Sequence, residues 1–175
     1  MRYNELTFQG RNAVLEAFRS GKTIDKLFIL DGCQDGPIKS IVREAKKTDA
    51  IINYVDKERL DRLAGTGHHQ GVVAIGAAYE YAEVEDILAA AKEKGEDPFI
   101  FILDEIEDPH NLGAIIRTAN LAGAHGVIIP KRRAVGLTAT VAKTSAGAIN
   151  YTPVAKVTNI SQTIEELKKQ GLWFV

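Results

Sequence analysis

The stretch FIFILDEIEDPHNLGAIIRTANLAGAHGVIIP, residues 99–130, decides the fold class of this chain. It opens with five apolar residues in a row, which is typical of a strand buried on both faces in a parallel sheet. Asp108 then suits a helix N-cap, Pro109 the first helical position, and Gly123 a left-handed helix end. A second apolar run, Val127 to Ile129, provides the return strand. The pattern predicts a βαβ unit, and such sheets bind ligands at the carboxyl ends of their strands.

The composition of the whole chain is ordinary for a globular protein. Its 175 residues are 45% hydrophobic and 26% charged, with a formal net charge of −1. Without a global basic excess, nucleic-acid binding would have to use local patches. The single cysteine, Cys33, excludes an internal disulfide framework and suits a reducing compartment. No signal segment opens the chain and no apolar run reaches the roughly 18 residues of a membrane helix, so we expect a cytoplasmic α/β protein without a membrane span.

Helix and strand signals alternate over residues 1–78. The helices are expected at Arg11–Ser20, at Pro37–Lys47 and after an Asp56 cap, and the strands at Lys26–Leu30, Ile51–Val55 and Gly71–Ile75. This alternation predicts a compact α/β domain with its own small core.

A composition rich in Glu, Ala and Lys follows, and we expect residues 79–96 to form a linker helix centred on Val84–Lys94. The second domain would then span residues 97–175. After the βαβ unit we expect these elements: a small-residue helix near Leu137–Ser145, a strand at Val154–Val157, a helix with a capping box formed by Asn159 and Gln162, and the start of a buried strand at Leu172–Val175. Because chains rarely end inside a core strand, the sequence is predicted to be truncated there.

On a helical wheel, the helix that starts at Pro109 has distinct faces. Its apolar stripe is predicted to comprise Leu112, Ile115, Ile116, Ala119 and Ala122. His110 and Arg117 share a face away from that stripe, and Gly113 is expected to leave open space beside the guanidinium. Helix N-termini favour anions, and the arginine fork matches phosphate. The pattern therefore predicts an anion site around Asn111 and Arg117, although a plainly solvated arginine remains the alternative.

Other polar clusters carry weaker signals. The carboxylates Asp104, Glu105, Glu107 and Asp108 fit a helix cap plus solvated loop charges better than a metal site. The histidines His68, His69, His110 and His125 lack zinc-ligand spacing with Cys33, so we expect no metal. The loop GTGHHQG precedes a strand and is not a dinucleotide fingerprint. The basic triplet Lys131, Arg132 and Arg133 is either a surface turn or a contact to a nucleic-acid backbone.

At DPHNLGAIIRTANLAGAHGVIIP, residues 108–130, the sequence closely resembles motif 1 of the SpoU/TrmH family, with Asn111, Gly113 and Arg117 in the family's order and spacing. These proteins are S-adenosylmethionine-dependent RNA 2′-O-ribose methyltransferases with the SPOUT α/β-knot fold. The segments QGRNAVLEAF, KLFIL and HQGVVA resemble the family's N-terminal substrate-binding domain, an L7Ae/L30e-like RNA-binding fold. The best likeness is to the RlmB-type subgroup, the 23S rRNA guanosine-2′-O-methyltransferases.

The resemblance implies methyl transfer from S-adenosylmethionine to a ribose 2′-hydroxyl, most closely that of a guanosine in 23S rRNA. Arg117 matches the family's catalytic arginine, and Asn111 would position Arg117 or the ribose. Free arginine has a pKa above about 12 and is no base near pH 7. We therefore favour a guanidinium that orients phosphate and stabilises oxyanion charge over one that is deprotonated in a dry site. The resemblance also implies rRNA processing and a homodimer formed through the catalytic domain.

One departure from the family is large. Motif 2, with a Gly-Ser/Ala-Glu segment, and motif 3, with a Ser-Leu-Asn segment, match nothing in this sequence. These motifs complete the knot and most of the S-adenosylmethionine pocket, so we assign no cofactor-binding residues and expect this chain alone to be inactive. A tRNA 2′-O-methyltransferase and a non-catalytic RNA-binding fragment are the alternatives.

Overall fold

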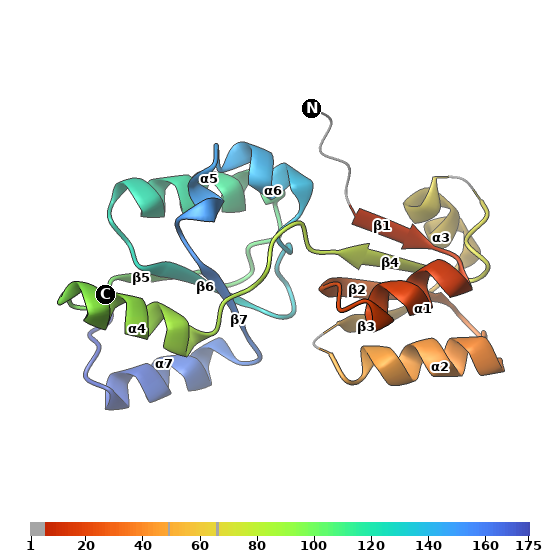
Figure 1. Cartoon of the computed structure of the whole chain (residues 1–175), viewed down its shortest axis with the longest axis horizontal. Coiled ribbons are helices and arrows are strands. Elements are labelled where there is room, and N and C mark those ends of the chain that lie inside the picture. The colour runs from red at the N-terminus through yellow and green to blue at the C-terminus, as the bar shows by residue number, and fades with distance from the viewer. Residues whose placement is uncertain (1–5, 49, 66) are drawn as a thin grey trace. The chain divides into compact units, whose positions relative to one another are not determined.

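The structure is a computed structural model that describes residues 6–48, 50–65 and 67–175. It divides into two compact units, Met1–Ala78 and Tyr79–Val175, each with its own sheet (Figure 1). Both units are α/β, which confirms the predicted fold class. Among the described residues, no helix is long and apolar enough to cross a membrane.

The first unit is a four-stranded mixed sheet covered by helices on both faces (Figure 1). Its elements in chain order are β1 (Leu6–Gln9), α1 (Arg11–Arg19), β2 (Ile24–Leu30), α2 (Gly36–Ala45), β3 (Ile51–Val55), α3 (Lys57–Ala64) and β4 (Val72–Gly76). The strand order is β1-β4-β2-β3, in which β2 and β3 are parallel and β4 runs antiparallel to both β1 and β2.

Strand alternation explains the layers of this unit. In β2, Leu27 and Ile29 face the core beneath α1 and α2, whereas Phe28 faces the smaller core beneath α3. The predicted strand Ile51–Val55 is confirmed. Sequence reasoning missed β1, because a four-residue strand has too short an apolar pattern and depends on its pairing with β4.

The second unit is a three-stranded parallel sheet in the order β5-β6-β7 between two helical layers. Its elements are α4 (Val84–Lys94), β5 (Ile100–Ile102), α5 (Pro109–Leu121), β6 (Gly126–Pro130), α6 (Ala139–Thr144), the 3₁₀ turn η1 (Ala148–Asn150), β7 (Val154–Val157) and α7 (Ile160–Lys169). In the central strand β6, Val127 and Ile129 pack toward α5 and α6, and Ile128 packs toward α4 and α7.

The residues expected to link the domains are part of this second unit. Helix α4 has the predicted bounds Val84–Lys94, but Ile87 packs fully buried in one core cluster with Ile128, Ala155 and Leu167. The backbone N–H of Ala82 also donates to the Val154 carbonyl at 2.9 Å. The segment 79–96 therefore covers one face of the sheet. Its composition, rich in Glu, Ala and Lys, indicated a linker, yet a helix needs only one apolar stripe to join a core.

Three further expectations are corrected. The strand predicted at Phe99–Leu103 is shorter and only half-buried, with Phe99 46% exposed, because β5 pairs only with β6 and lies at the sheet edge. Residues 172–175 form no strand, and Trp173 is 96% exposed. At the start of α7, Asn159 does accept from the Gln162 backbone, but the Gln162 side chain donates to Glu166 instead of completing the capping box.

Candidate functional site

The loops that follow the parallel strands of the second unit meet at the carboxyl edge of the sheet. The loop after β5 and the loop after β6 are joined there by a hydrogen bond from the Val135 N–H to the Ile106 carbonyl, at 2.8 Å. An ion pair adds to this contact, with Arg133 Nη1 2.9 Å from Glu105 Oε1. This edge is the place where ligand-binding residues are expected in open α/β sheets.

Both residues of that ion pair have a left-handed backbone. Glu105 has a φ of 53° and Arg133 a φ of 57°, a conformation that L side chains rarely adopt. Such conformations persist where the surroundings over-determine them, and they cluster at functional sites. The two loops are therefore held in defined shapes at this edge.

Tyr81 supports the same edge, and sequence reasoning did not single it out. Its hydroxyl accepts a hydrogen bond from the Leu137 N–H at 2.8 Å, and the Lys156 ammonium lies 4.1 Å from the centre of its ring. Tyr81 thus connects the segment before α4 with the loop that leads to α6. No local sequence pattern reveals a contact between residues so far apart.

Helix α5 begins at this edge and carries the predicted site residues. The Asp108 carboxylate accepts from the Asn111 N–H at 2.8 Å, which confirms Asp108 as the N-cap. This contact corrects the expectation that the first-turn amides attract an external anion, because the cap places its own negative charge on them. An anion site on this helix would therefore depend on the positive charge of Arg117.

Gly113 has a different role from the expected one. A Cβ at this position would lie 2.8 Å from the Cβ of Thr144 and 3.0 Å from the Ser145 nitrogen, and it would also clash with the Thr144 hydroxyl. Gly113 therefore lets α6 approach α5 directly and does not leave open space beside Arg117. Thr144 strengthens this contact, since its hydroxyl lies 3.3 Å from the Pro109 carbonyl.

The face of α5 that carries His110 and Arg117 is exposed, as the wheel predicts. The buried stripe comprises Leu112, Gly113, Ile116 and Ala119, so the predicted stripe is too wide: Ile115 is half-buried and Ala122 is exposed. Within the described part of the chain, the Arg117 side chain forms no ion pair or hydrogen bond. Asn111 is also exposed. It lies six positions before Arg117, about 9 Å along the helix axis, and no hydrogen bond joins the two side chains among the described residues.

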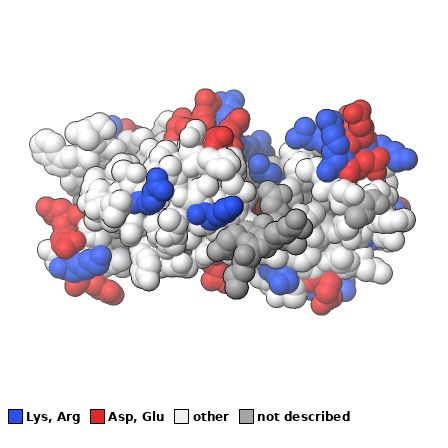
Figure 2. Space-filling view, turned by 90° about the horizontal axis from the view of Figure 1, so that it is seen from above, with Lys and Arg blue, Asp and Glu red and all other residues white. Residues whose placement is uncertain are grey.

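The basic triplet follows β6 directly. Lys131 is half-buried and its backbone N–H donates to the Val157 carbonyl at 2.9 Å, whereas Arg132 and Arg133 are exposed. Arg133 pairs with Glu105, so Arg132 is the more accessible of the two arginines for an external anion. Figure 2 shows basic side chains at several places on the face it presents, most of them beside acidic side chains, and the described residues form no continuous basic patch on this face.

The acidic residues at this edge do not assemble into a metal site. No group of three or more His, Cys, Asp or Glu side chains that could hold a metal ion occurs in residues 6–48, 50–65 and 67–175. Asp108 caps α5 and Glu105 pairs with Arg133, which gives these two carboxylates structural partners.

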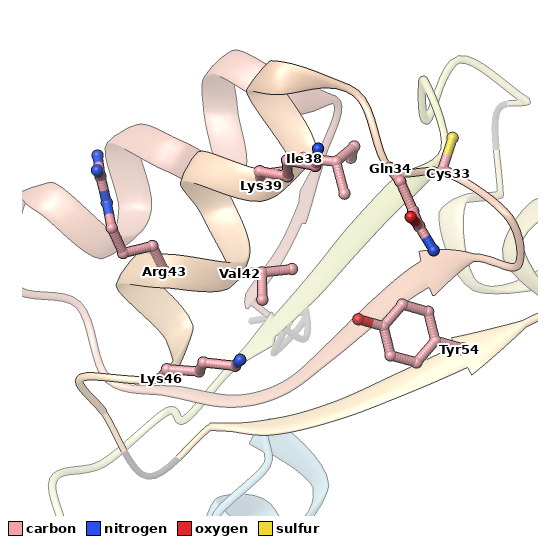
Figure 3. A pocket seen from close by; sticks show the side chains of 8 residues that line it. All are labelled: Cys33, Gln34, Ile38, Lys39, Val42, Arg43, Lys46 and Tyr54. Carbon is pink, nitrogen blue, oxygen red and sulfur yellow. The ribbon is translucent and has the colours of Figure 1, made fainter.

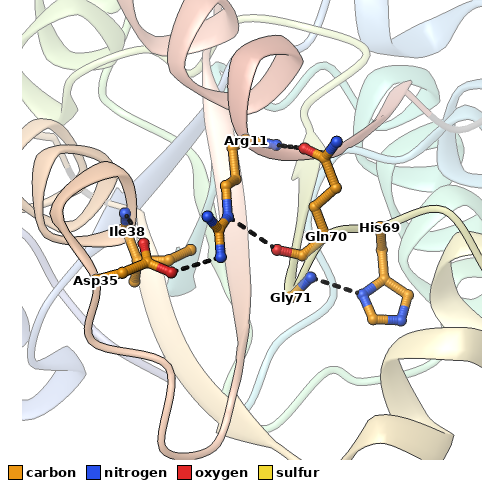
Figure 4. A network of polar contacts seen from close by, with 6 residues as sticks. All are labelled: Arg11, Asp35, Ile38, His69, Gln70 and Gly71. Atoms are coloured by element: carbon orange, nitrogen blue, oxygen red, sulfur yellow. Dashed lines mark hydrogen bonds and ion pairs between the residues drawn. The ribbon is translucent and has the colours of Figure 1, made fainter.

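In the first unit, the two segments QGRN and HHQG meet although they are about 60 positions apart in sequence. The Arg11 N–H donates to Gln70 Oε1 at 3.1 Å, and Arg11 Nε donates to the Gln70 carbonyl at 3.2 Å (Figure 4). Arg11 also pairs with Asp35, the N-cap of α2. Arg11 and Gln70 line a cavity of about 630 Å³. Thr66, in the GTGHHQG loop, lies outside the described residues.

His69 and His68 are adjacent in sequence but differ in burial and in hydrogen bonding. His69 is 5% exposed, accepts from the Gly71 N–H at 3.0 Å through Nδ1, and contacts Asp61 at 2.9 Å through Nε2. His68 is exposed. The buried ring therefore fixes the entry into β4, whereas His68 is left at the surface.

We expect His69→Ala to lower the free energy of unfolding by about 1–3 kcal/mol, because it leaves the Gly71 N–H buried without its acceptor. The matched change His68→Ala should alter stability by less than about 0.5 kcal/mol. Urea denaturation followed by far-ultraviolet circular dichroism measures both. Equal effects of the two substitutions would contradict the structural role of His69.

Both units match known protein families. Residues 9–82 match the family model described as RNA 2′-O ribose methyltransferase substrate binding, and residues 98–175 match the SpoU rRNA methylase family. A Staphylococcus haemolyticus protein assigned by name to the TrmH family of tRNA/rRNA methyltransferases is 48% identical over 169 residues, covering 97% of this chain and 68% of the relative. The chain belongs to the SpoU/TrmH family.

A second SpoU/TrmH relative, YacO of Bacillus subtilis, is 54% identical over 166 residues, which cover 95% of this chain and 66% of the relative. The chain thus spans about two thirds of the length of the curated relatives it matches. Among solved structures, it is similar to an AdoMet-bound rRNA methyltransferase from Sinorhizobium meliloti, at 23% identity and a TM-score of 0.43, covering 93% of this chain and 58% of that one. The SpoU methyltransferase AviRb from Streptomyces viridochromogenes, solved with AdoMet, gives 20% identity and a TM-score of 0.46, with 97% and 60% coverage.

Proposed function

We propose that this chain is the larger part of an RNA 2′-O-ribose methyltransferase that modifies rRNA or tRNA. The observation that carries the proposal is Arg117, an exposed guanidinium that has no partner among the described residues and lies on the helix that begins at the carboxyl edge of the sheet. Membership of the SpoU/TrmH family, with both family models matched in order along the chain, supports this reading of the arginine.

The proposed methyl donor is S-adenosylmethionine, the molecule bound in solved members of the family. Asn111 and Arg117 lie on open helix surface, and no buried side-chain nitrogen or oxygen among the described residues lacks a hydrogen-bond partner that a cofactor could replace. We therefore assign no cofactor-binding residues in this chain.

Arg117 is proposed to bind the phosphate next to the target ribose and to stabilise negative charge that develops on the 2′-oxygen. A planar guanidinium presents paired N–H donors that match phosphate oxygens. Arg117 is exposed on α5, and this position suits a charged guanidinium better than a deprotonated one, because a neutral arginine would need a dry, enclosed site. Asn111 is proposed to position either Arg117 or the ribose.

Further RNA contacts are proposed at both units. Lys131, Arg132 and Arg133 would meet the RNA backbone near the carboxyl edge, with Arg132 contributing most because Arg133 is paired with Glu105. Residues 1–78 would hold RNA by its shape and its unpaired bases, the mode by which proteins usually recognise RNA sequence. Binding through phosphates should weaken steeply as salt rises.

The proposed target is a guanosine in 23S rRNA, and tRNA is the second candidate because relatives are named for both RNA classes. Mapping 2′-O-methyl marks in RNA from a strain that lacks the gene, against its parent, tests this directly. Loss of one guanosine mark in 23S rRNA is the expected result. Loss of a tRNA mark instead would favour the second candidate, and no lost mark in either RNA would contradict methyl transfer.

The 175-residue chain alone is expected to bind RNA without transferring methyl groups. Incubation with methyl-labelled S-adenosylmethionine and total RNA, followed by counting of label in RNA, measures this. Label incorporation by the chain would show that its own residues complete the active site. A homodimer and a cytoplasmic location stay predictions.

A further inference from the structure

A groove between α2 and β3 of the first unit combines features that suit a nucleotide. Its volume is about 420 Å³, within the range of about 300–1,000 Å³ typical of small-ligand sites. The floor is apolar and includes Ile38, which is 2% exposed, and the half-buried Val42. Figure 3 shows the Tyr54 ring, the Gln34 amide and the Lys46 ammonium directed into the same space.

Tyr54 is unusual for its position in the sheet. It lies on β3, the edge strand of the order β1-β4-β2-β3, and is 57% exposed. The other β3 residues are half-buried. An exposed aromatic ring beside an apolar floor offers a stacking surface, and unpaired bases stack on such rings largely independently of sequence.

The charge of the groove is one-sided. Lys39, Arg43 and Lys46 line it, and no carboxylate is among the described residues that line it. The nearby Glu44 is engaged elsewhere, since the Lys47 ammonium donates to both of its oxygens at 3.0 and 2.9 Å. The same hydrogen bond holds the pKa of Glu44 below its usual value. Arg43 approaches Glu44 only at 4.0 Å, so the cations at the rim remain available for phosphates.

We propose that the α2–β3 groove binds an unpaired nucleotide of the substrate RNA, with its base stacked on Tyr54 and its phosphates at Lys39 and Lys46. The surface is separate from the Arg11–Gln70 cavity of the same unit, whose lining shares only Cys33 with the groove. The inference rests on the proposed function, because it assigns a place in the first unit where single-stranded RNA is held. The Gln34 amide would pair with the edge of the base.

The test uses the whole chain and two fluorescein-labelled RNAs, decauridylate and a blunt ten-base-pair duplex, in anisotropy titrations at several salt concentrations. Decauridylate should bind more tightly than the duplex. Tyr54→Ala should weaken decauridylate binding about tenfold, since the loss of one stacked base costs about 5- to 150-fold in affinity. Lys46→Gln should also weaken it and reduce the slope of log affinity against log salt by about 0.7.

Matched controls separate this surface from general effects. Tyr151→Ala removes another tyrosine, 80% exposed and in the second unit, and Lys168→Gln removes a lysine of the second unit that is paired with Glu165. Both should leave decauridylate binding within about twofold of the parent, a difference well below the loss from one stacked base. Circular dichroism melting should give the same transition for Tyr54→Ala as for the parent, because this side chain is mostly exposed.

Two results would overturn the inference. If Tyr54→Ala and Lys46→Gln bind decauridylate as the parent does, the groove is not an RNA site, and a protein partner becomes its better occupant. In that case, binding of a 23S rRNA transcript by the parent would leave the proposed function standing. If the parent binds neither decauridylate nor the transcript, RNA recognition by the first unit fails as well.

Discussion

Arg117→Ala should reduce the rate of RNA methylation by about 100-fold or more, the largest effect expected from any single substitution in this chain. The guanidinium is exposed, has no partner among the described residues and lies on the helix that starts at the ligand edge of the sheet. Its removal leaves the proposed phosphate and the developing oxyanion without their donors. The initial rate of methyl transfer by the enzyme from the intact gene, with labelled S-adenosylmethionine and the target RNA, measures the effect.

Two companion variants sharpen this experiment. Arg117→Lys keeps a positive charge but loses the planar fork, so only a small part of the rate should return. Lys94→Ala is the matched control. Lys94 is the last residue of α4, which precedes β5, so it lies near the amino edge of the sheet, whereas the helix that carries Arg117 begins at the carboxyl edge. The Lys94→Ala enzyme should retain the parental rate. An Arg117→Ala enzyme within about threefold of the parent would refute a donor role, whose loss costs far more.

Gly113→Ala should lower the free energy of unfolding of the second unit by about 2 kcal/mol, although alanine normally favours a helix over glycine by up to about 1 kcal/mol. The new methyl group would lie 2.8 Å from the Thr144 Cβ and 3.0 Å from the Ser145 nitrogen. Because Ser145 N is backbone, α6 must shift away from α5. For a unit of this size the melting temperature should fall by roughly 10 °C in scanning calorimetry.

Gly36→Ala provides the control for Gly113→Ala. Gly36 begins α2, and a Cβ there would meet no atom within 4 Å. This substitution should be neutral or stabilising by up to about 1 kcal/mol. Thr144→Ala, combined with Gly113→Ala, should recover part of the loss, since it removes the clashing hydroxyl. A Gly113→Ala protein as stable as Gly36→Ala would contradict the close packing of α5 and α6.

Much of the fold could be predicted because its signals are local. The cap at Asp108, the bounds of α4 and the strand at Ile51–Val55 depend on residues only a few positions apart. Helical and strand periodicity also identified Leu112 and Ile116 as core and Arg117 as exposed. The family resemblance at residues 108–130 rests on the same contiguous residues, and the comparisons confirm the family.

The errors share a different origin. The half-buried state of β5 depends on which strand pairs with it, and the sheet order leaves it at an edge. The width of the α5 stripe depends on how much of the helix its neighbours cover. The role of Gly113 depends on the approach of Thr144, which is 31 positions later in the chain. A helical wheel contains none of this information.

The sequence by itself determined the α/β class, the helix that carries Asn111 and Arg117, and the family to which the chain belongs. Only the tertiary structure decided that Gly113 lets α6 approach α5, that Glu105 pairs with Arg133, and that Tyr54 and Lys46 face one groove. The physical reason is the range of the interactions. Propensity and capping act within a turn or two of the backbone, whereas ion pairs, close helix contacts and grooves arise when distant segments pack together.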